Sequence, residues 1–404
     1  MKLSLNVVPP KGPEPQGGEP PAFTRLSEPM RRFACNQKGC CCSGWDIPFR
    51  LEDFLRLHEH LDGADREALK KDLKLVLEQK PNERGEQVLH ALKLDGVGAG
   101  RACRFLEGEG SCGVQKRHGI QALPDLCVDF PAFAYKQEGN GVELWFDPVC
   151  PEVLEQLDES DEPLRIHQQQ GRFGDEGLDL RVSHAADKLV ARVGAEAISQ
   201  RALEQIRHQS LEALAVQRAP WRTLAALGHA YRRLRPGNEA AFEVVDPEDP
   251  QQFLIFLGDC ISAHGADVLA ATALRYQRFI WSIDPVPLVT SPLLAPALQD
   301  WGAAFERWLA PREELLWPLM RRWLAHRFST PMVKGRTNLK AACDDIVMLY
   351  GTSLRFAAAF GEALQREVDR DLYKAAIGSA EFFYRSLNLP REALPSFAAR
   401  LPSA

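Results

Sequence analysis

The sequence predicts an α+β protein in which a small N-terminal cysteine-rich metal-binding module with short hairpins precedes a mainly α-helical domain. Two observations predict this division. Eight of the ten cysteines lie between positions 35 and 150, and dense thiols are typical of metal or iron–sulfur sites. After position 150 the apolar residues follow an almost entirely helical pattern. We therefore expect a disordered proline-rich tail at 1–22, a cysteine-cluster module at 23–155 and an α-helical domain at 156–404.

Composition describes an ordinary globular protein. The chain has 404 residues, of which 45% are hydrophobic and 26% charged, and its net charge is −6. This charge gives no reason to expect nucleic acid or an anionic membrane as a partner. No apolar run reaches the length of a transmembrane helix, so we expect no membrane span. The N-terminus has no signal-peptide pattern, and we expect a cytoplasmic protein.

The densest group of cysteines follows the proline-rich tail. Prolines and glycines up to Pro21 exclude a helix or a central strand there. The next cysteines fall in a predicted loop with Gly39 and Gly44, which allow a tight backbone. Helices are predicted to follow, one beginning at Leu51 and one over 64–79. The cysteines of this loop are Cys35, Cys40, Cys41 and Cys42.

Predicted hairpins carry the later cysteines. Cys103 and Cys112 flank a Gly-Glu-Gly turn, which predicts a hairpin that brings them close together. A second hairpin is predicted from 132–136 and 142–146. It leads to Cys150, just before a predicted helix whose N-terminus would stabilise a thiolate. The later cysteines are Cys103, Cys112, Cys127 and Cys150.

A metal or iron–sulfur centre explains this clustering better than the alternatives, a disulfide framework or buried thiols. Neighbouring side chains point apart, so three consecutive cysteines make poor disulfide partners. A cytoplasmic chain also keeps its thiols reduced. Eight thiolates exceed the four ligands of one tetrahedral zinc ion, and His118 is the only histidine between Cys103 and Cys150. We favour an iron–sulfur cluster over zinc, with all eight cysteines as candidate ligands.

The C-terminal part is predicted to consist of helices interrupted by prolines and glycines. Cys260 and Cys343 are isolated among apolar residues and are predicted to be core residues. Aromatic and basic residues interleave over 301–328 as in nucleic-acid grooves, but the helical spacing of the aromatics favours helices packed on a core. The predicted helices span 152–158, 186–217, 221–234, 250–263, 266–282, 295–309, 312–328, 338–364 and 366–387.

Two sets of motifs resemble known families. The order Cys41-Cys42, Cys103-x-Phe105-Leu106, Gly110-x-Cys112, and Cys127 shortly before Phe130-Pro131 resembles the zinc- or iron-chelating cysteine-cluster domain proteins. Within that wider group, Cys42-Ser43-Gly44-Trp45-Asp46-Ile47 and Cys150-Pro151-Glu152 are similar to the flagellin lysine N-methylases. The resemblance covers residues 33–155, and the helical remainder is similar only in length and helicity.

The resemblance implies a cysteine-ligated metal centre. In the methylase branch it also implies methyl transfer from S-adenosylmethionine to lysine amines of flagellin. The alternative is a non-catalytic zinc- or iron-chelating protein whose module stores, delivers or senses metal, or only holds the fold together. Binding of the methyl donor would distinguish the methyltransferase from the non-catalytic metal-binding protein. The sequence assigns no catalytic or donor-binding residue: Trp45, Asp46 and Glu152 lie beside candidate ligands, but packing, capping and helix N-terminal charge explain them.

Overall fold

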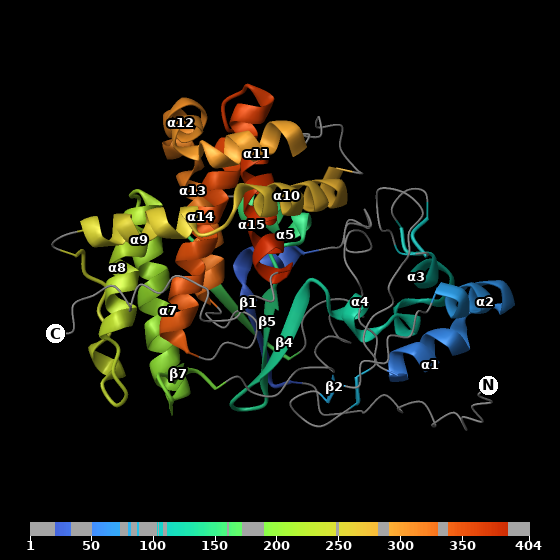
Figure 1. Cartoon of the computed structure of the whole chain (residues 1–404). Helices are drawn as coiled ribbons and strands as arrows, with labels where there is room; N and C mark the ends of the chain where they lie inside the picture. Colours follow the sequence, from blue (N-terminus) through green and yellow to red (C-terminus); the bar gives the residue numbers. More distant parts are fainter. Residues whose placement is uncertain are drawn as a thin grey trace. The chain divides into compact units, whose positions relative to one another are not determined.

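The computed structural model divides into two compact units. Unit 1 comprises Met1–Thr24, Cys35–Leu144 and Gln169–Ala186, and unit 2 comprises Arg25–Ala34, Trp145–Gln168 and Asp187–Ala404. Helices and strands both occur, and the C-terminal part is mostly helical, as predicted (Figure 1). The structure describes residues 21–33, 51–72, 80–81, 87–88, 103, 105–107, 111–159, 161–171, 190–247, 250–281, 291–329 and 338–386.

Unit 1 contains short helices around one small apolar core. The predicted helix at Leu51 is confirmed as α1, and the described part of the predicted helix over 64–79 is α2. Leu57 and Leu61 pack with Phe105, Val114 and Leu123 in the core. Two short strands, β2 and β3, pair antiparallel. The bounds are α1 Leu51–His60, α2 Gly63–Asp72, β2 Lys80–Pro81, β3 Gln87–Val88, α3 Gly113–His118, η3 Ile120–Ala122 and α4 Asp125–Asp129.

A four-stranded sheet has the strand order β4-β5-β1-β6. β4 and β5 confirm the second predicted hairpin, whose turn holds Gly139 and Asn140 at positive φ. β1 and β6 were not predicted, since their strand neighbours are distant in the sequence. Ala22, in the predicted tail, donates its backbone N–H to the Asn140 carbonyl over 2.7 Å. The strands are β1 Phe23–Ser27, β4 Ala132–Gln137, β5 Gly141–Phe146 and β6 Ile166–Gln170.

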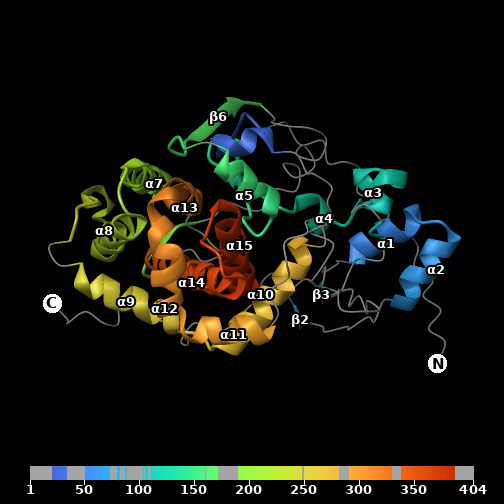
Figure 2. The ribbon, with the colours of Figure 1, turned by 90° about the horizontal axis from the view of Figure 1, so that it is seen from above.

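The long helix α14 (Leu339–Leu364) is the centre of unit 2. Every residue from Asp345 to Gly361 is buried, as expected for a helix that is apolar on all sides. It packs against α15, α9, α11 and α8, and lies among these helices in both views (Figures 1 and 2). The other helices are η1 Glu28–Arg32, α5 Pro151–Asp158, α7 Gln200–Ala215, α8 Pro220–Arg233, η4 Glu239–Ala241, α9 Gln251–Ser262, α10 Ala266–Trp281, α11 Ser291–Gln299, α12 Trp301–Ala304, η5 Phe305–Leu309, η6 Ala310–Arg312, α13 Glu313–Ser329 and α15 Arg370–Ser386.

Arg355, on α14, joins α14 to the ends of two other helices. Its guanidinium donates to the carbonyl oxygens of Ile261, in the last turn of α9, and of His264, two residues after α9, both over 2.8 Å. It also donates to the carbonyl of Leu298 near the end of α11 over 2.9 Å. The last carbonyls of a helix have no partner inside the helix, so Arg355 satisfies groups that the two helices leave open.

Two predicted helices differ from the structure. The helix predicted over 186–217 begins only at α7, because β7 (Arg192–Val193) and β8 (Glu196–Ala197) form a small hairpin before it. Ser199 then caps α7 by accepting from the Ala202 backbone N–H over 3.1 Å. The helix predicted over 295–309 is broken at Asp300 into α11 and α12 and continues as the π-helical turn η5.

No single helix of the described residues is long and apolar enough to cross a membrane. One pair, α9 with Ala266–Ala273 of α10, meets the criteria of length and composition together, with a bend of 67° between its members.

Candidate functional site

Three of the predicted ligand cysteines lie in unit 1 and pack against the same apolar core. Cys103, Cys112 and Cys127 are half-buried and contact the cluster that includes Phe105 and Val128. Cys103 and Cys112 come from one predicted hairpin and Cys127 from α4, so the fold packs two separate segments on this core. The three cysteines therefore share one apolar core, which does not by itself place their sulfur atoms together.

The first predicted hairpin is confirmed by its backbone hydrogen bonds. Leu106 and Cys112 form an antiparallel bridge, and the Glu107 N–H donates to the Ser111 carbonyl over 2.9 Å. Cys112 then immediately precedes α3. Arg117 on that helix forms an ion pair with Glu107. The hairpin and α3 therefore hold the backbone of Cys112 on both sides.

Charged groups hold α4, which carries Cys127, against α1. Arg56 on α1 contacts the Asp53 carboxylate at 2.5 Å and the Asp125 carboxylate at 2.6 Å. The Asp125 backbone N–H donates to Asp53 over 2.9 Å. Asp53 is buried, where an acid needs such partners. This arrangement fixes the first turn of α4, two residues before Cys127.

The described part of unit 1 contains no group of side chains that could hold the predicted metal. Thiol groups suit soft metals. Within the described ranges, however, no group of three or more Cys, His, Asp or Glu side chains could hold a metal ion. Cys103, Cys112 and Cys127 therefore do not form a complete ligand set by themselves. The other unit 1 candidates, Cys35, Cys40, Cys41 and Cys42, lie outside the described residues, as do Trp45 and Asp46.

Cys150 belongs to unit 2 and stands at the N-cap of α5, as predicted. Its carbonyl accepts from the Val153 N–H over 3.1 Å, and its own N–H donates to the Asp147 carbonyl over 3.0 Å. The side chain is half-buried. Pro151 occupies the first helical position, where a missing N–H costs nothing. Cys150 is therefore held by the start of a helix, which is a rigid position for a side chain.

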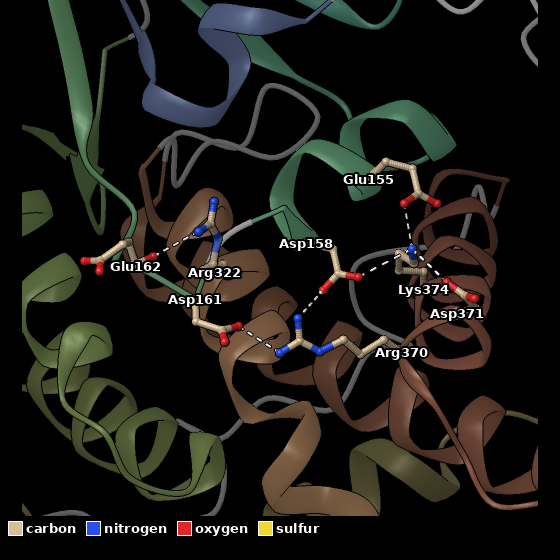
Figure 3. Close-up of polar contacts among 8 residues, drawn as sticks. All are labelled: Glu155, Asp158, Asp161, Glu162, Arg322, Arg370, Asp371 and Lys374. Carbon is tan, nitrogen blue, oxygen red and sulfur yellow. Dashed lines mark hydrogen bonds and ion pairs between the residues drawn. The ribbon is translucent and has the colours of Figure 1, made fainter.

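Ion pairs anchor the other end of α5. Lys374 on α15 contacts Glu155 at 2.6 Å, Asp371 at 2.9 Å and Asp158 at 3.4 Å (Figure 3). Burial opposes the charge of Lys374, but its hydrogen bonds with Glu155 and Asp371 outweigh burial and raise its pKa above the usual value. Arg370 pairs with Asp158 at 3.1 Å. Lys374 and Arg370 therefore fasten the last turn of α5 to α15.

A buried polar cluster of α13 and α15 was not predicted. Glu381 accepts from Trp323 Nε1 over 2.8 Å and from Arg327 Nε over 2.6 Å. The Arg327 guanidinium lies 5.0 Å from the ring centroid of Trp145, which adds a cation–π contact. The segment over 301–328 was predicted to pack on a core, and Trp323 is fully buried. Arg322 and Arg327 of this segment are buried too, and the carboxylate that neutralises Arg327 comes from a residue 54 positions away.

His326 is the other buried titratable group of this region. Its Nε2 lies 2.6 Å from the Phe146 carbonyl and its Nδ1 lies 3.2 Å from Ser27 Oγ. A carbonyl only accepts, so Nε2 carries the proton and Nδ1 accepts from the serine hydroxyl. Burial lowers the pKa of His326 to about 4. The imidazole is therefore neutral near pH 7 and acts as a hydrogen-bonding link.

Comparison with curated proteins finds weak similarity to bacterial methylases. The chain is 28% identical over 139 residues to a protein named lysine-N-methylase from Salmonella typhimurium. The aligned stretch covers 33% of this chain and 32% of that protein. A protein named flagellar biosynthetic protein FliU from Salmonella muenchen is 27% identical over 137 residues, or 33% of this chain and 76% of that protein.

The similarity is local. The chain spans about a third of the length of the curated lysine-N-methylases that it matches. No protein-family model matches the chain, and no solved structure matches it.

Proposed function

We propose that this chain binds a metal through its cysteine cluster and transfers methyl groups from S-adenosylmethionine to lysine side chains of a protein such as flagellin. The methyl-transfer part rests on the similarity to the Salmonella proteins named lysine-N-methylase and FliU. The metal part rests on the packing of Cys103, Cys112 and Cys127 against one core. The two parts have different support, so they are tested separately.

The proposed metal would be held by thiolates. In unit 1 the candidate ligands are Cys103, Cys112 and Cys127 together with the cysteines at 35–42, and Cys150 is the candidate of unit 2. We favour an iron–sulfur cluster over zinc because thiolates are in excess of one zinc ion's needs. A bound centre would add free energy to the folding of the segments that supply its ligands.

The proposed methyl transfer makes clear demands on the protein. The lysine amine attacks as a neutral group, so the site must remove its proton or exclude water from it. As the new N–C bond forms, the C–S bond of the donor breaks, the sulfur keeps the electron pair, and the methylated amine then loses a proton. Holding the amine in line with the methyl carbon is mainly a positioning task. We assign no described residue to these steps.

The methyl-transfer proposal is tested with labelled S-adenosylmethionine and flagellin. We expect anaerobically purified protein to label lysine side chains, detected by peptide mass spectrometry. Replacing Cys103, Cys112 and Cys127 together by serine should reduce the labelling. Cys260→Ala is the matched control, because Cys260 is a buried cysteine of α9 in unit 2. Absence of lysine label together with absence of donor binding by calorimetry would contradict the proposal.

The alternative function is a non-catalytic metal-binding protein. The packing of three half-buried cysteines on one apolar core supports it independently of any methyl donor. Metal analysis and the absorption spectrum of the anaerobic protein test this part. Iron with sulfide supports the cluster, and stoichiometric zinc in a colourless protein supports a zinc centre. Protein that binds metal but neither binds donor nor labels lysine would leave this alternative.

A further inference from the structure

A small pocket in unit 2 has a mixed lining of apolar and charged groups. It lies between α7, α13 and the segment after α5, and is a partly open hollow whose total space, with the solvent at its mouth, is about 350 Å³. Leu211 and Leu214 of α7 and Pro318 of α13 give it apolar walls, and Leu164 is buried at its edge. Such walls with a few polar groups are typical of sites for small organic molecules.

The segment that forms one wall is held in place by two arginines. Arg370 pairs with Asp161 at 2.8 Å, and the buried Arg322 donates to the Glu162 carbonyl over 3.0 Å. Both contacts are drawn in Figure 3. The wall is therefore set by the folded protein, so a ligand would meet a preformed surface.

Arg321, the second arginine of the lining, has most of its donors open. A guanidinium has five N–H groups. Among the described residues, Arg321 makes one long hydrogen bond, 3.4 Å from Nη1 to the Arg218 carbonyl, and no ion pair. It is half-buried. Burial lowers its pKa, and the Asp161 charge opposes this effect, but an arginine remains charged at neutral pH.

The two carboxylates at the pocket do not cancel this charge. Asp161 is mostly exposed and already pairs with Arg370, so its field at the pocket is reduced by that pair and by solvent. Glu162 is exposed to solvent as well. The lining also contains two arginines, Arg321 and Arg322, which balance the two carboxylates. The partly buried positive charge of Arg321 is the one best placed to receive an anion.

We propose that this pocket binds a short organic carboxylate, with the carboxylate on Arg321 and the aliphatic part against Leu211, Leu214 and Pro318. Two parallel N–H donors of a guanidinium match the two oxygens of a carboxylate. The apolar walls favour a branched aliphatic body over an inorganic anion, and the small volume favours few carbon atoms. The proposal is independent of the metal centre and of methyl transfer.

Ligand-detected NMR titration of the full-length protein tests the pocket, with isobutyrate as the probe. We expect saturable binding with a Kd on the order of 10 mM, as for very small ligands. Isobutyramide has the same shape without the charge. Its Kd should be at least about ten-fold higher than that of isobutyrate, because it loses the charge-assisted hydrogen bonds. Inorganic phosphate should also bind more weakly than isobutyrate.

Variants assign the binding to this pocket. Arg321→Gln should weaken isobutyrate binding about ten-fold. Arg233→Gln removes an exposed arginine of α8 and should leave the Kd unchanged. Equal binding by Arg321→Gln and the parent overturns the proposal, as does equal binding of the amide or of phosphate. Absence of saturable binding by the parent overturns it too. If Arg321→Gln does not fold, the comparison of acid with amide on the parent decides.

Discussion

The neutral state of His326 depends on its burial between two strands to which its ring is hydrogen-bonded. Its ring bonds to Phe146 in β5 and Ser27 in β1, and stacks on Trp145 with ring centroids 5.9 Å apart. Protonation would give Nδ1 a proton where Ser27 now donates. It would also place a positive charge beside Arg327, whose charge already contributes to the low pKa of His326.

The first prediction is a loss of stability in mild acid. In the unfolded chain the pKa of a histidine is about 6.5, and in the folded protein that of His326 is about 4. Between these values the unfolded state binds more protons, so the contribution of His326 is complete above pH 6.5 and is lost as the pH falls towards 4. The full loss is about 3 kcal/mol. Urea unfolding at pH 7 and pH 5 measures the first part of this loss, about 2 kcal/mol.

His208 provides the control for this prediction. It is exposed on α7 beside Glu212. We expect His326→Gln to flatten the pH dependence and His208→Gln to leave it unchanged. Equal slopes for the parent and His326→Gln would show that other groups cause the acid sensitivity.

The second prediction concerns the ion pair of Arg327 and Glu381. Both side chains are almost fully buried, so Glu381→Gln leaves the Arg327 charge without its carboxylate. Loss of one partner of a buried pair costs about 3–5 kcal/mol. Glu367→Gln is the control: Glu367 pairs with Arg312 at the surface, and exposed pairs contribute at most about 1 kcal/mol. Chemical unfolding measures both, and similar losses for the two variants would contradict the prediction.

At the scale of elements, the close contact between α10 and α15 depends on the absence of a side chain at Gly378. A Cβ at Gly378 would stand 1.9 Å from the Tyr276 hydroxyl oxygen. Tyr276 is fully buried and donates to the Val149 carbonyl over 3.1 Å. The glycine therefore leaves room for a tyrosine that holds the backbone next to Cys150.

The third prediction compares two glycines inside helices. Alanine usually stabilises a helix interior by about 1 kcal/mol over glycine. At Gly378 the clash with Tyr276 should reverse the sign, with a loss of about 1–3 kcal/mol, as for overpacked cores. At Gly258 in α9 a Cβ meets no atom within 4 Å, so Gly258→Ala should be neutral or stabilising. A thermal melt of each variant tests this, and a gain for Gly378→Ala would refute it.

Helices and strands that form through interactions between residues close in the sequence could be predicted, and those that depend on residues distant in the sequence could not. The β4–β5 hairpin and α14 were found because turn residues and apolar periodicity act within one segment. β1 was missed because its neighbours in the sheet, β5 and β6, lie more than a hundred residues away. The same reason hid the partners of Arg327 and His326. The start of α7 was misplaced because Gly194 takes a positive φ in the β7–β8 turn, which periodicity does not reveal.

At the scale of the whole molecule, the candidate cysteines are divided between the units. Cys103, Cys112 and Cys127 belong to unit 1, whereas Cys150 belongs to unit 2. The sequence predicted the packing of the first three on one core only in part. Cys103 and Cys112 lie in a hairpin that a local turn indicates. Cys127 lies on α4, and the ion pairs that hold α4 against α1 could not be predicted from the sequence. Metal ligation itself remains a prediction.

The fourth prediction follows from the proposed metal centre and concerns where its removal acts. Ligand thiolates stabilise the segments that carry them. Chelation should therefore speed amide hydrogen exchange in α4, which carries Cys127, in α3, which follows Cys112, and in α1, which packs on the same core. The middle of α14, which has no candidate ligand, should keep its protection. Exchange mass spectrometry before and after verified metal removal measures both. Unchanged exchange in α1, α3 and α4 would count against a structural role for the metal.

The hydrogen bonds of Arg355 also have a consequence for folding during synthesis, because the acceptors are made before the donor. Its acceptors precede it by 57 to 94 residues, so a ribosome that adds about 5–20 residues per second makes them roughly 3 to 20 seconds before their donor. During that interval these carbonyls lack the donor that they have in the folded protein. The helices made first therefore cannot complete their packing as they leave the ribosome. Their packing is completed only after α14, which carries Arg355, has been made.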